Sequence, residues 1–570
     1  MKILVVGAGP TGLTMASELS RHGVSCKIID SAAAPTTQSR ALGIHARTLE
    51  YFELMGIINQ FLDRGAVMRG VNMYDNDKQI LKLSLRELDT PYPFVLSLPQ
   101  SETEEILGAH LASYGVQVER ENTLVDLVKG DKALGVVIQA ADGTLATEKF
   151  DWVIGCDGAH SAVRHQLHAS FEGSKYAEVF ALIDTELECP SLSRDEMHMF
   201  TTKDGLLAVF PMKGNRARII ADLTTKEQAK GQQVATDATT KLPAPTLEEM
   251  QTIAAKRGPK DMSFKSAHWL SAFAIHRRQV TSYRHGRVFL AGDAAHVHSP
   301  AGGQGMNTGI QDAINLAWKL ALVCKGEAKE SVLDSYNHER HEVGAAVLKL
   351  TDFLTRVNVL RNPVAQAVRN TLAPLVAGQD VVQQRMAKEV AELSFNYRKS
   401  PLVAEHKVSL VQTQPVGKSS TEKVETGEWF AFESGPQPGD RAPDANLVDA
   451  ATGQPISLFE VFRGTQFHLL LLMGERANSS GARTLIEIAN FVTDEYGAHI
   501  KPHLIAPHLG GGSDLGWTGS KLLDPEVSLH HKYGGGSECL YLIRPDTYVG
   551  FRSLPADKVA LNEYLERIFV

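Results

Sequence analysis

The first thirty residues change periodicity twice, from strand to helix and back to strand. Residues 3–6 and 24–30 are mainly aliphatic runs, and Leu13, Ala16 and Leu19 recur between them at helical spacing. This order is typical of a βαβ unit, in which the two strands pair in parallel. Because a glycine turn interrupts the first apolar run at once, we interpret that run as a strand and not as a signal peptide.

Two later segments have the pattern of buried strands, and the part between them alternates. Residues 150–155 and 288–292 are short apolar runs, which predicts further parallel strands. Residues 180–223 alternate apolar and polar positions, which predicts antiparallel strands. Apolar positions at helical spacing predict a long helix over 305–324, and residues 331–395 are mostly helical in pattern. We therefore expect an α/β fold with a parallel-sheet domain built from separated segments around an inserted antiparallel sheet.

The pattern changes again near residue 400. Residues 397–430 are polar and lack periodicity, which favours a linker, and a second α/β pattern begins after residue 436. The predicted organisation is a discontinuous domain at 1–180 with 275–395, an inserted antiparallel sheet at 181–274, a linker at 396–435 and a C-terminal α/β domain at 436–570.

Composition narrows the class of protein. The 570 residues include 58 basic and 66 acidic side chains, a net charge of −8, so no basic surplus exists to neutralise a nucleic acid. No apolar run approaches the roughly 20 residues that cross a bilayer. The five cysteines are scattered without a CxxC pair, which argues against a disulfide framework and against a metal site. We expect a cytoplasmic protein with reduced cysteines, no membrane span and no nucleic-acid partner.

Residues 7–12, which read Gly-Ala-Gly-Pro-Thr-Gly, stand between the first strand and the first helix. In a dinucleotide fingerprint at this place, Gly7 allows the tight turn, Gly9 admits a pyrophosphate and Gly12 lets the helix pack on the strand. The N–H groups at the helix start then hold the phosphates. Asp30 ends the second strand, where a carboxylate would bind a ribose hydroxyl. These residues predict a dinucleotide site and leave the choice between NAD and FAD open.

Two more motifs follow predicted strands. Residues 156–164 read Cys-Asp-Gly-Ala-His-Ser-Ala-Val-Arg, and residues 292–307 begin with Gly-Asp-Ala-Ala-His. Asp293 stands at a strand end, where a carboxylate can bind a sugar hydroxyl. Residues 300–303 can bring backbone close to a flat ligand. Residues 304–307 open the long helix, whose positive end points at that ligand.

In this order and at these separations, the three motifs resemble those of class A FAD-dependent aromatic hydroxylases, the para-hydroxybenzoate hydroxylase type, over about residues 1–395. The resemblance implies a Rossmann-like FAD-binding domain. It also implies that NADPH or NADH reduces FAD, that O2 forms a flavin C4a-hydroperoxide, and that one oxygen atom passes to a small aromatic substrate, phenolic or polycyclic. A second dinucleotide fingerprint is absent, which fits that family.

The resemblance further implies which residues bind FAD. Arg40 and Gln100 align with an FAD-contacting arginine and glutamine, and Asp157 serves both FAD and NADPH in the family. The implied FAD-binding residues are Gly7, Gly9, Pro10, Thr11, Gly12, Asp30, Arg40, Gln100, Asp157, Asp293, Pro300, Gly303, Gly305, Met306 and Asn307. A guanidinium beside a diphosphate has a clear electrostatic rationale.

The inserted sheet is expected to form one wall of an apolar substrate pocket. The expected lining residues are Phe200, Phe210, Pro211 and Met212, and ordinary core packing is the alternative for each. A closed apolar pocket would keep water from the reactive flavin.

A base near a phenolic hydroxyl would speed the reaction. Some relatives place an Asp or His two residues after the position of Arg40, and this chain has Leu42 there. His45, His298 and Tyr176 are therefore candidate bases by side-chain type alone, and deprotonation by solvent is the alternative.

The C-terminal part resembles the thioredoxin-like domain that is appended to many larger members of the family. No cysteine follows its predicted central strand at 469–473, and Cys539 lies in an apolar context. Redox activity needs an accessible thiolate, so we expect a structural or interaction role. The sequence leaves a homodimer open.

Two alternatives to aromatic hydroxylation stay open at this point. The same fold can perform Baeyer–Villiger or epoxidation chemistry. A less favoured alternative is a non-catalytic flavin-binding interaction protein.

Overall fold

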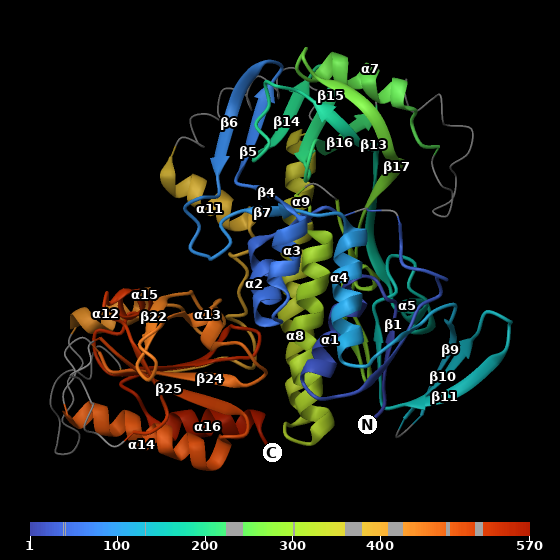
Figure 1. Cartoon of the computed structure of the whole chain (residues 1–570). Helices are drawn as coiled ribbons and strands as arrows, with labels where there is room; N and C mark the ends of the chain where they lie inside the picture. The colour runs from blue at the N-terminus through green and yellow to red at the C-terminus, as the bar shows by residue number, and fades with distance from the viewer. Residues whose placement is uncertain are drawn as a thin grey trace.

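The computed structural model describes residues 1–570 except 38, 40, 131–132, 224–242, 300–301, 359–378, 409–425, 475–478 and 508–516. The fold of the described part is mixed α/β, as predicted, with one six-stranded and two eight-stranded sheets. Figure 1 shows the inserted sheet at the top, the six-stranded sheet and its helices at the centre, and the C-terminal region at the lower left. None of the described helices combines the length and the apolar character that crossing a bilayer requires.

The six-stranded sheet has the order β18-β19-β12-β1-β2-β8. Its strands are β1 (Ile3–Val6), β2 (Cys26–Ile29), β8 (Val118–Glu119), β12 (Trp152–Gly155), β18 (Arg284–His285) and β19 (Val288–Leu290). β1 pairs in parallel with β2 and β12, and β12 pairs in parallel with β19, so the predicted apolar runs enter one sheet. Helices α1 (Pro10–Arg21), α4 (Gln100–Ser113) and α8 (Gly305–Lys325) pack together beside it. The three sequence motifs follow β1, β12 and β19, at the carboxyl edge where ligands bind to such sheets.

The inserted sheet has the order β20-β17-β13-β16-β15-β14-β5-β6. Its strands are β5 (Gly70–Asp75), β6 (Lys78–Ser84), β13 (Phe171–Glu188), β14 (Met197–Thr202), β15 (Gly205–Pro211), β16 (Arg216–Leu223), β17 (Ser263–Val280) and β20 (His296–Val297). β14 pairs in parallel with β5, so residues 70–84 extend the sheet that residues 181–274 were predicted to form. Helix α7 (Leu247–Arg257) covers one face, where Met250 and Ile253 pack against Val209.

The remaining elements of residues 1–390 accompany these two sheets, and six of their strands form two three-stranded sheets, β11-β10-β9 and β3-β7-β4. They are β3 (Gly43–Ile44), β4 (Ala66–Met68), β7 (Val95–Ser97), β9 (Thr123–Lys129), β10 (Leu134–Gln139), β11 (Leu145–Phe150), α2 (Ala46–Leu54), α3 (Ile58–Arg64), α5 (Ala162–Gln166), η1 (Gly292–Ala294), η2 (Glu330–Leu333), α9 (Asp334–Asn358) and α11 (Asp380–Val390). Helix α11 packs against β6, and it leads into a segment that passes between α2 and α8.

The C-terminal region, residues 436–570 together with β21 and α12 from the segment before it, is built on an eight-stranded sheet of order β21-β28-β27-β24-β25-β26-β22-β23. Its strands are β21 (Ala404–Lys407), β22 (Asn446–Asp449), β23 (Pro455–Ser457), β24 (Phe467–Leu472), β25 (Ile500–Ala506), β26 (Ser520–Leu523), β27 (Cys539–Ile543) and β28 (Val549–Leu554). Its helices are α12 (Thr426–Ser434), α13 (Leu458–Val461), α14 (Ser479–Tyr496), α15 (Ser528–Tyr533) and α16 (Lys558–Ile568). Within the predicted linker, β21 pairs in parallel with β28, so this segment adds a strand to the C-terminal sheet.

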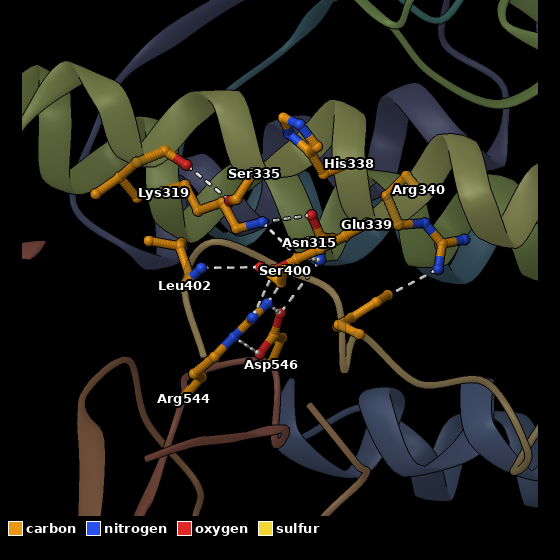
Figure 2. A network of polar contacts seen from close by, with 12 residues as sticks. Asn315, Lys319, Ser335, His338, Glu339, Arg340, Ser400, Leu402, Arg544 and Asp546 are labelled. Atoms are coloured by element: carbon orange, nitrogen blue, oxygen red, sulfur yellow. Dashed lines mark hydrogen bonds and ion pairs between the residues drawn. The ribbon is translucent and has the colours of Figure 1, made fainter. Parts of the chain in front are cut away.

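A cluster of buried charges joins the C-terminal region to α8 and α9 (Figure 2). The Glu339 carboxylate accepts two hydrogen bonds from Arg544, at 2.7 and 2.9 Å, and one from Lys319, at 2.7 Å. Arg544 also donates to Asp546, and Asn315 donates to Glu339 at 2.6 Å. The four charged side chains have 0% exposure. We call Asn315, Lys319, Glu339, Arg544 and Asp546 the Glu339 network.

Candidate functional site

The glycine turn between β1 and α1 is shaped to receive an anion. Gly7 has a left-handed φ of 99°, and a Cβ there would lie 2.4 Å from the Cys156 carbonyl oxygen. A Cβ on Gly12 would lie 1.9 Å from the Gly7 carbonyl oxygen, whereas one on Gly9 would meet nothing within 4 Å. Gly9 is also the N-cap of α1 and offers no side chain to its first N–H groups. Open space therefore adjoins unsatisfied donors, which fits the diphosphate of FAD.

Asp30 lies directly beside this turn. Its Oδ2 accepts a hydrogen bond from the Ala8 N–H at 2.6 Å, and its Oδ1 accepts one from the Ala32 N–H at 2.8 Å. The side chain is 17% exposed, and Arg120 approaches it to 3.7 Å. The carboxylate that was predicted to bind a ribose thus also ties β2 to the glycine turn.

The motif at residues 156–164 is hydrogen-bonded to the motif that follows β19. Asp157 accepts hydrogen bonds from the Ser161 hydroxyl at 2.5 Å and from the Val163 N–H at 3.1 Å, and burial raises its pKa. The buried Arg164 donates to the carbonyl oxygen of Ala294 at 3.1 Å. Asp293, the neighbour of Ala294 in η1, is exposed. Our sequence reasoning assigned no role to Arg164, although it ends the second motif, and it is the residue that joins the two motifs in space.

Asn307 organises the start of α8. Its Oδ1 accepts a hydrogen bond from the His45 N–H at 3.0 Å, and its Nδ2 donates to the carbonyl oxygens of Gly43 and Gly303 at 2.9 and 3.1 Å. Gly302 and Gly303 have left-handed φ values of 101° and 69°, which glycine adopts without strain. The turn that precedes Gly305 and Met306 is thereby held against the N-terminal end of α2.

Two of the candidate bases border this turn as neutral imidazoles. The His45 Nε2 lies 3.3 Å from the Gly303 carbonyl oxygen, and burial lowers the His45 pKa to about 4. The His298 ring lies beside Gly305, and burial together with His296 lowers its pKa to about 4. The Nδ1 of His45 and the Nε2 of His298 have no hydrogen-bond partner among the described residues. The side chain of the third candidate, Tyr176, lies outside the described part.

Gln100 shapes the loop that follows β2. Its Oε1 accepts a hydrogen bond from the Ala41 N–H at 3.1 Å, and its Nε2 donates to Glu104 at 2.9 Å. Arg40 and Pro300, which the resemblance placed on FAD, lie outside the described residues. Leu42, which occupies the place of a base in some relatives, is buried.

One face of the inserted sheet looks toward this loop. Arg218 donates to both oxygens of Asp184, at 2.7 and 2.9 Å, and its Nη1 lies 3.4 Å from the Ala41 carbonyl oxygen. Phe210 pairs with Arg218 in register and shares its face. Next to it an apolar cluster on this face comprises Phe180, Met199, Leu206, Ile220 and Phe273. Our sequence reasoning missed Arg218, because no local pattern marks a buried ion pair between neighbouring strands.

The predicted lining residues divide between the two faces of this sheet. Phe200 packs with Val209, Met250 and Ile253 on the face that α7 covers, so it points away from the loop at Ala41. Strand alternation is the reason, because Phe200 and its neighbour Met199 must point to opposite faces. Phe210 is half-buried on the face with Arg218, whereas Pro211 and Met212 are buried at the end of β15.

Comparisons with known proteins show the family of this chain. The family described as "FAD binding domain" matches residues 1–351. The chain is 31% identical to pentachlorophenol 4-monooxygenase of Sphingobium chlorophenolicum, over 97% of this chain and 93% of that protein. It is 32% identical to 6-methylpretetramide 4-monooxygenase of Streptomyces rimosus, over 100% of this chain and 93% of that protein.

A solved structure extends the likeness to the fold. The aromatic hydroxylase CabE from angucycline biosynthesis has a TM-score of 0.72 and 26% identity, and the match covers 99% of this chain and 98% of that one. The family match spans more than half of the chain, and both relatives match nearly all of it. The chain belongs to the FAD-binding family of aromatic monooxygenases.

Proposed function

We propose that this protein is an NAD(P)H- and FAD-dependent monooxygenase that hydroxylates a phenolic or polycyclic aromatic compound. The observation that carries the proposal is the convergence of three motifs at the carboxyl edge of the parallel strands β1, β12 and β19. Arg164 joins the second motif to the third, and Asn307 joins the start of α8 to the start of α2. When bound, FAD supplies the redox chemistry that activates O2.

The geometry supports a set of residues that would hold FAD. Residues 7–12 would receive the diphosphate at the start of α1, with Asp30 and Gln100 on either side of the following loop. The exposed Asp293 would face the middle of the cofactor, and Gly303, Gly305, Met306 and Asn307 would border the ring. We keep Asp157 and Pro300 in the proposed set because of their places in the motifs, and Arg40 because it aligns with an FAD-contacting arginine of the family.

The substrate would lie between this ring position and the inserted sheet. Phe210 and the apolar cluster of Phe180, Met199 and Phe273 would form the wall and exclude water. The names of the relatives, which mention pentachlorophenol and 6-methylpretetramide, support an aromatic substrate. His45 and His298 are weak bases in this environment, so we assign them to shaping the turn at Gly303 and leave deprotonation to solvent.

We propose the finer division of the fold on the same grounds. A Rossmann-like FAD-binding domain of residues 1–180 with 275–395 would carry the inserted sheet, to which β5 and β6 add two strands. The C-terminal region would be thioredoxin-like. Burial raises the pKa of its Cys539 thiol, which supports a role without redox chemistry.

The test is NADPH oxidation by the FAD-loaded protein with a panel of simple and polycyclic phenols, with NADH in parallel. We expect one compound to accelerate oxidation while little hydrogen peroxide forms, and its product to gain one oxygen atom on the ring. Equal peroxide with every compound would contradict phenol hydroxylation. No consumption of either nucleotide under any condition would contradict the monooxygenase assignment for this chain.

A further inference from the structure

Glu392 lies where α11 meets the proposed flavin site, in an unusual backbone conformation. Its φ is 58°, in the left-handed region that non-glycine residues adopt at an energetic cost. The segment that ends at Glu392 contacts two helix starts, because the Ala391 carbonyl accepts from the Arg47 N–H at 3.2 Å and Gln304 donates to the Glu389 carbonyl at 3.4 Å. Residues 389–392 therefore connect the beginnings of α2 and α8.

The carboxyl group of Glu392 forms an incomplete pair with Gln311 of α8. The Gln311 Nε2 donates to the Glu392 Oε2 at 2.5 Å. The remaining oxygens, Oε1 of Glu392 and Oε1 of Gln311, are both buried and have no hydrogen-bond partner among the described residues. Two acceptors cannot satisfy each other, and a buried unpaired acceptor is costly. A proton on Glu392 Oε1 could donate to Gln311 Oε1 and close a cyclic acid–amide pair, which would give both of these oxygens a partner.

The surroundings favour the protonated form. Burial raises the pKa of Glu392 to about 8, although Arg340 and the Gln311 amide oppose the shift. Two charged groups face it: Arg340 of α9 and Asp312 of α8. Arg340 donates to Asp312 at 2.6 Å, so a carboxylate at position 392 would share this guanidinium with a second carboxylate, which itself favours the neutral form of Glu392. Burial and the unpaired oxygens thus both favour the neutral form of Glu392 at pH 7.

Gln311 lies on the face of α8 that begins at the proposed flavin site. It follows Asn307 by four residues and Gln304 by seven, and positions at this spacing share one face of a helix. Asn307 fastens the turn at Gly303, and Gln304 contacts the Glu389 carbonyl. The Glu392–Gln311 pair therefore holds the first turns of α8 one helical turn beyond Asn307.

We propose that Glu392 is a positioning residue: its carboxyl group pairs with the Gln311 amide and fixes the first turns of α8 where the flavin ring is bound. The inference rests on the proposed function to the extent that this part of α8 borders FAD. It assigns Glu392 no contact with cofactor or substrate.

Three variants separate the roles of shape, proton and hydrogen bond. Glu392→Gln keeps the shape and can form two hydrogen bonds with Gln311, but it cannot ionise. Glu392→Leu removes both hydrogen bonds. Glu389→Gln is the matched control, a partly exposed glutamate in the last turn of α11. FAD dissociation constants are measured by flavin fluorescence from pH 6 to 9, and protonated carboxyl groups are counted by infrared difference spectroscopy.

We expect Glu392→Gln to bind FAD within about twofold of the wild type at pH 7. Above about pH 8 wild-type affinity falls and that of Glu392→Gln stays level, because only the wild type acquires a buried charge. Glu392→Leu weakens FAD binding about tenfold at pH 7, because it leaves the Gln311 amide unpaired. The wild type and Glu389→Gln share one protonated carboxyl band at pH 7 that Glu392→Gln lacks.

The proposal falls if Glu392→Gln keeps the alkaline loss of affinity, if the infrared band survives in Glu392→Gln, or if Glu392→Leu binds FAD like the wild type. Should Glu392→Leu fail to fold, the comparison of the wild type with Glu392→Gln decides alone. The infrared band needs no cofactor. A wild type that binds no FAD but shows the band would contradict the proposed function and the flavin-positioning role, and would leave only the acid–amide pair standing.

Discussion

Two buried polar regions lie along the same helix, α8, and they differ in how completely their groups are paired. The Glu339 network meets its second half, and every charge there has a partner within 3.0 Å. The first half adjoins what we call the flavin-side cluster, which comprises His45, His298, Gln304, Gln311 and Glu392. Each of these five side chains has a buried nitrogen or oxygen without a hydrogen-bond partner among the described residues.

The difference indicates that the Glu339 network anchors the C-terminal region, whereas the flavin-side cluster belongs to a binding site. A paired, desolvated charge cluster resists rearrangement, because removing one member leaves the others buried without compensation. Unpaired buried atoms are kept where a ligand, a water or a change of protonation completes them. The displaced pKa values agree, since burial makes His45 and Glu392 neutral, whereas Arg544 and Lys319 keep Glu339 ionised against the effect of burial.

The largest expected effect comes from breaking the anchor. Glu339→Gln leaves Arg544 and Lys319 without their shared counter-charge and should lower the free energy of unfolding by about 3–5 kcal/mol. Denaturant unfolding of the wild type and of Glu339→Gln measures this loss of free energy. Glu342→Gln is the control on the same helix: its partner Lys399 is 81% exposed, and the loss should stay below about 1 kcal/mol. Equal losses in the two variants would show that the network does not anchor the C-terminal region.

The flavin-side cluster should make the free energy of unfolding depend on pH in the acid range. The pKa of His45 falls from 6.5 to about 4 on burial, so its contribution is complete above pH 6.5 and is lost as pH falls toward 4. Over that window it amounts to about 3 kcal/mol, which His45→Gln should remove from the pH dependence of the unfolding free energy. His338→Gln, on the exposed side of α9, is the control for the loss of an imidazole. If the unfolding free energy of His45→Gln kept the same dependence on pH between 6.5 and 4, a group other than His45 would cause that dependence.

The sequence could predict the elements that local pattern defines and the motifs at strand ends. The strands predicted at 3–6, 150–155 and 288–292 could be recognised because their apolar runs and flanking glycines are local signals. In the structure they pair in parallel within one sheet. The family resemblance, confirmed by the comparisons, rested on those motifs.

Long-range partners could not be predicted in the same way. β5 joins β14 across more than a hundred residues, and Arg544 reaches Glu339 from 205 positions away, with no periodicity to mark either contact. Glu392 shows the same limit, because an isolated glutamate after a helix reads as a surface residue. Only its burial and the two unpaired oxygens of the Gln311 pair reveal the neutral acid.

Gly9 and Gly12 allow the ligand-facing part of the site to be separated from its framework. A Cβ at Gly9 meets nothing, so Gly9→Ala should keep the stability of the apoprotein and weaken FAD binding about a hundredfold by occupying the place of the diphosphate. Gly12→Ala places its Cβ 1.9 Å from the Gly7 carbonyl oxygen and should destabilise the apoprotein itself. Thermal unfolding without FAD and fluorescence titration with FAD measure the two effects. Unchanged FAD affinity in Gly9→Ala would remove the diphosphate from this turn.

The smallest effect tests which face of the inserted sheet meets the substrate. Phe210→Leu should raise the KM for the substrate found in the NADPH assay about fivefold and increase peroxide formation. Its stability should change little, because the Phe210 side chain is half-buried on the face that also carries Arg218. Phe200→Leu should lower the unfolding free energy by about 1–2 kcal/mol and leave KM alone, because Phe200 packs under α7. Strand alternation demands this division. If Phe200→Leu changed KM and Phe210→Leu did not, the substrate wall would be the face that α7 covers, and the site would have to be built on the other side of the sheet.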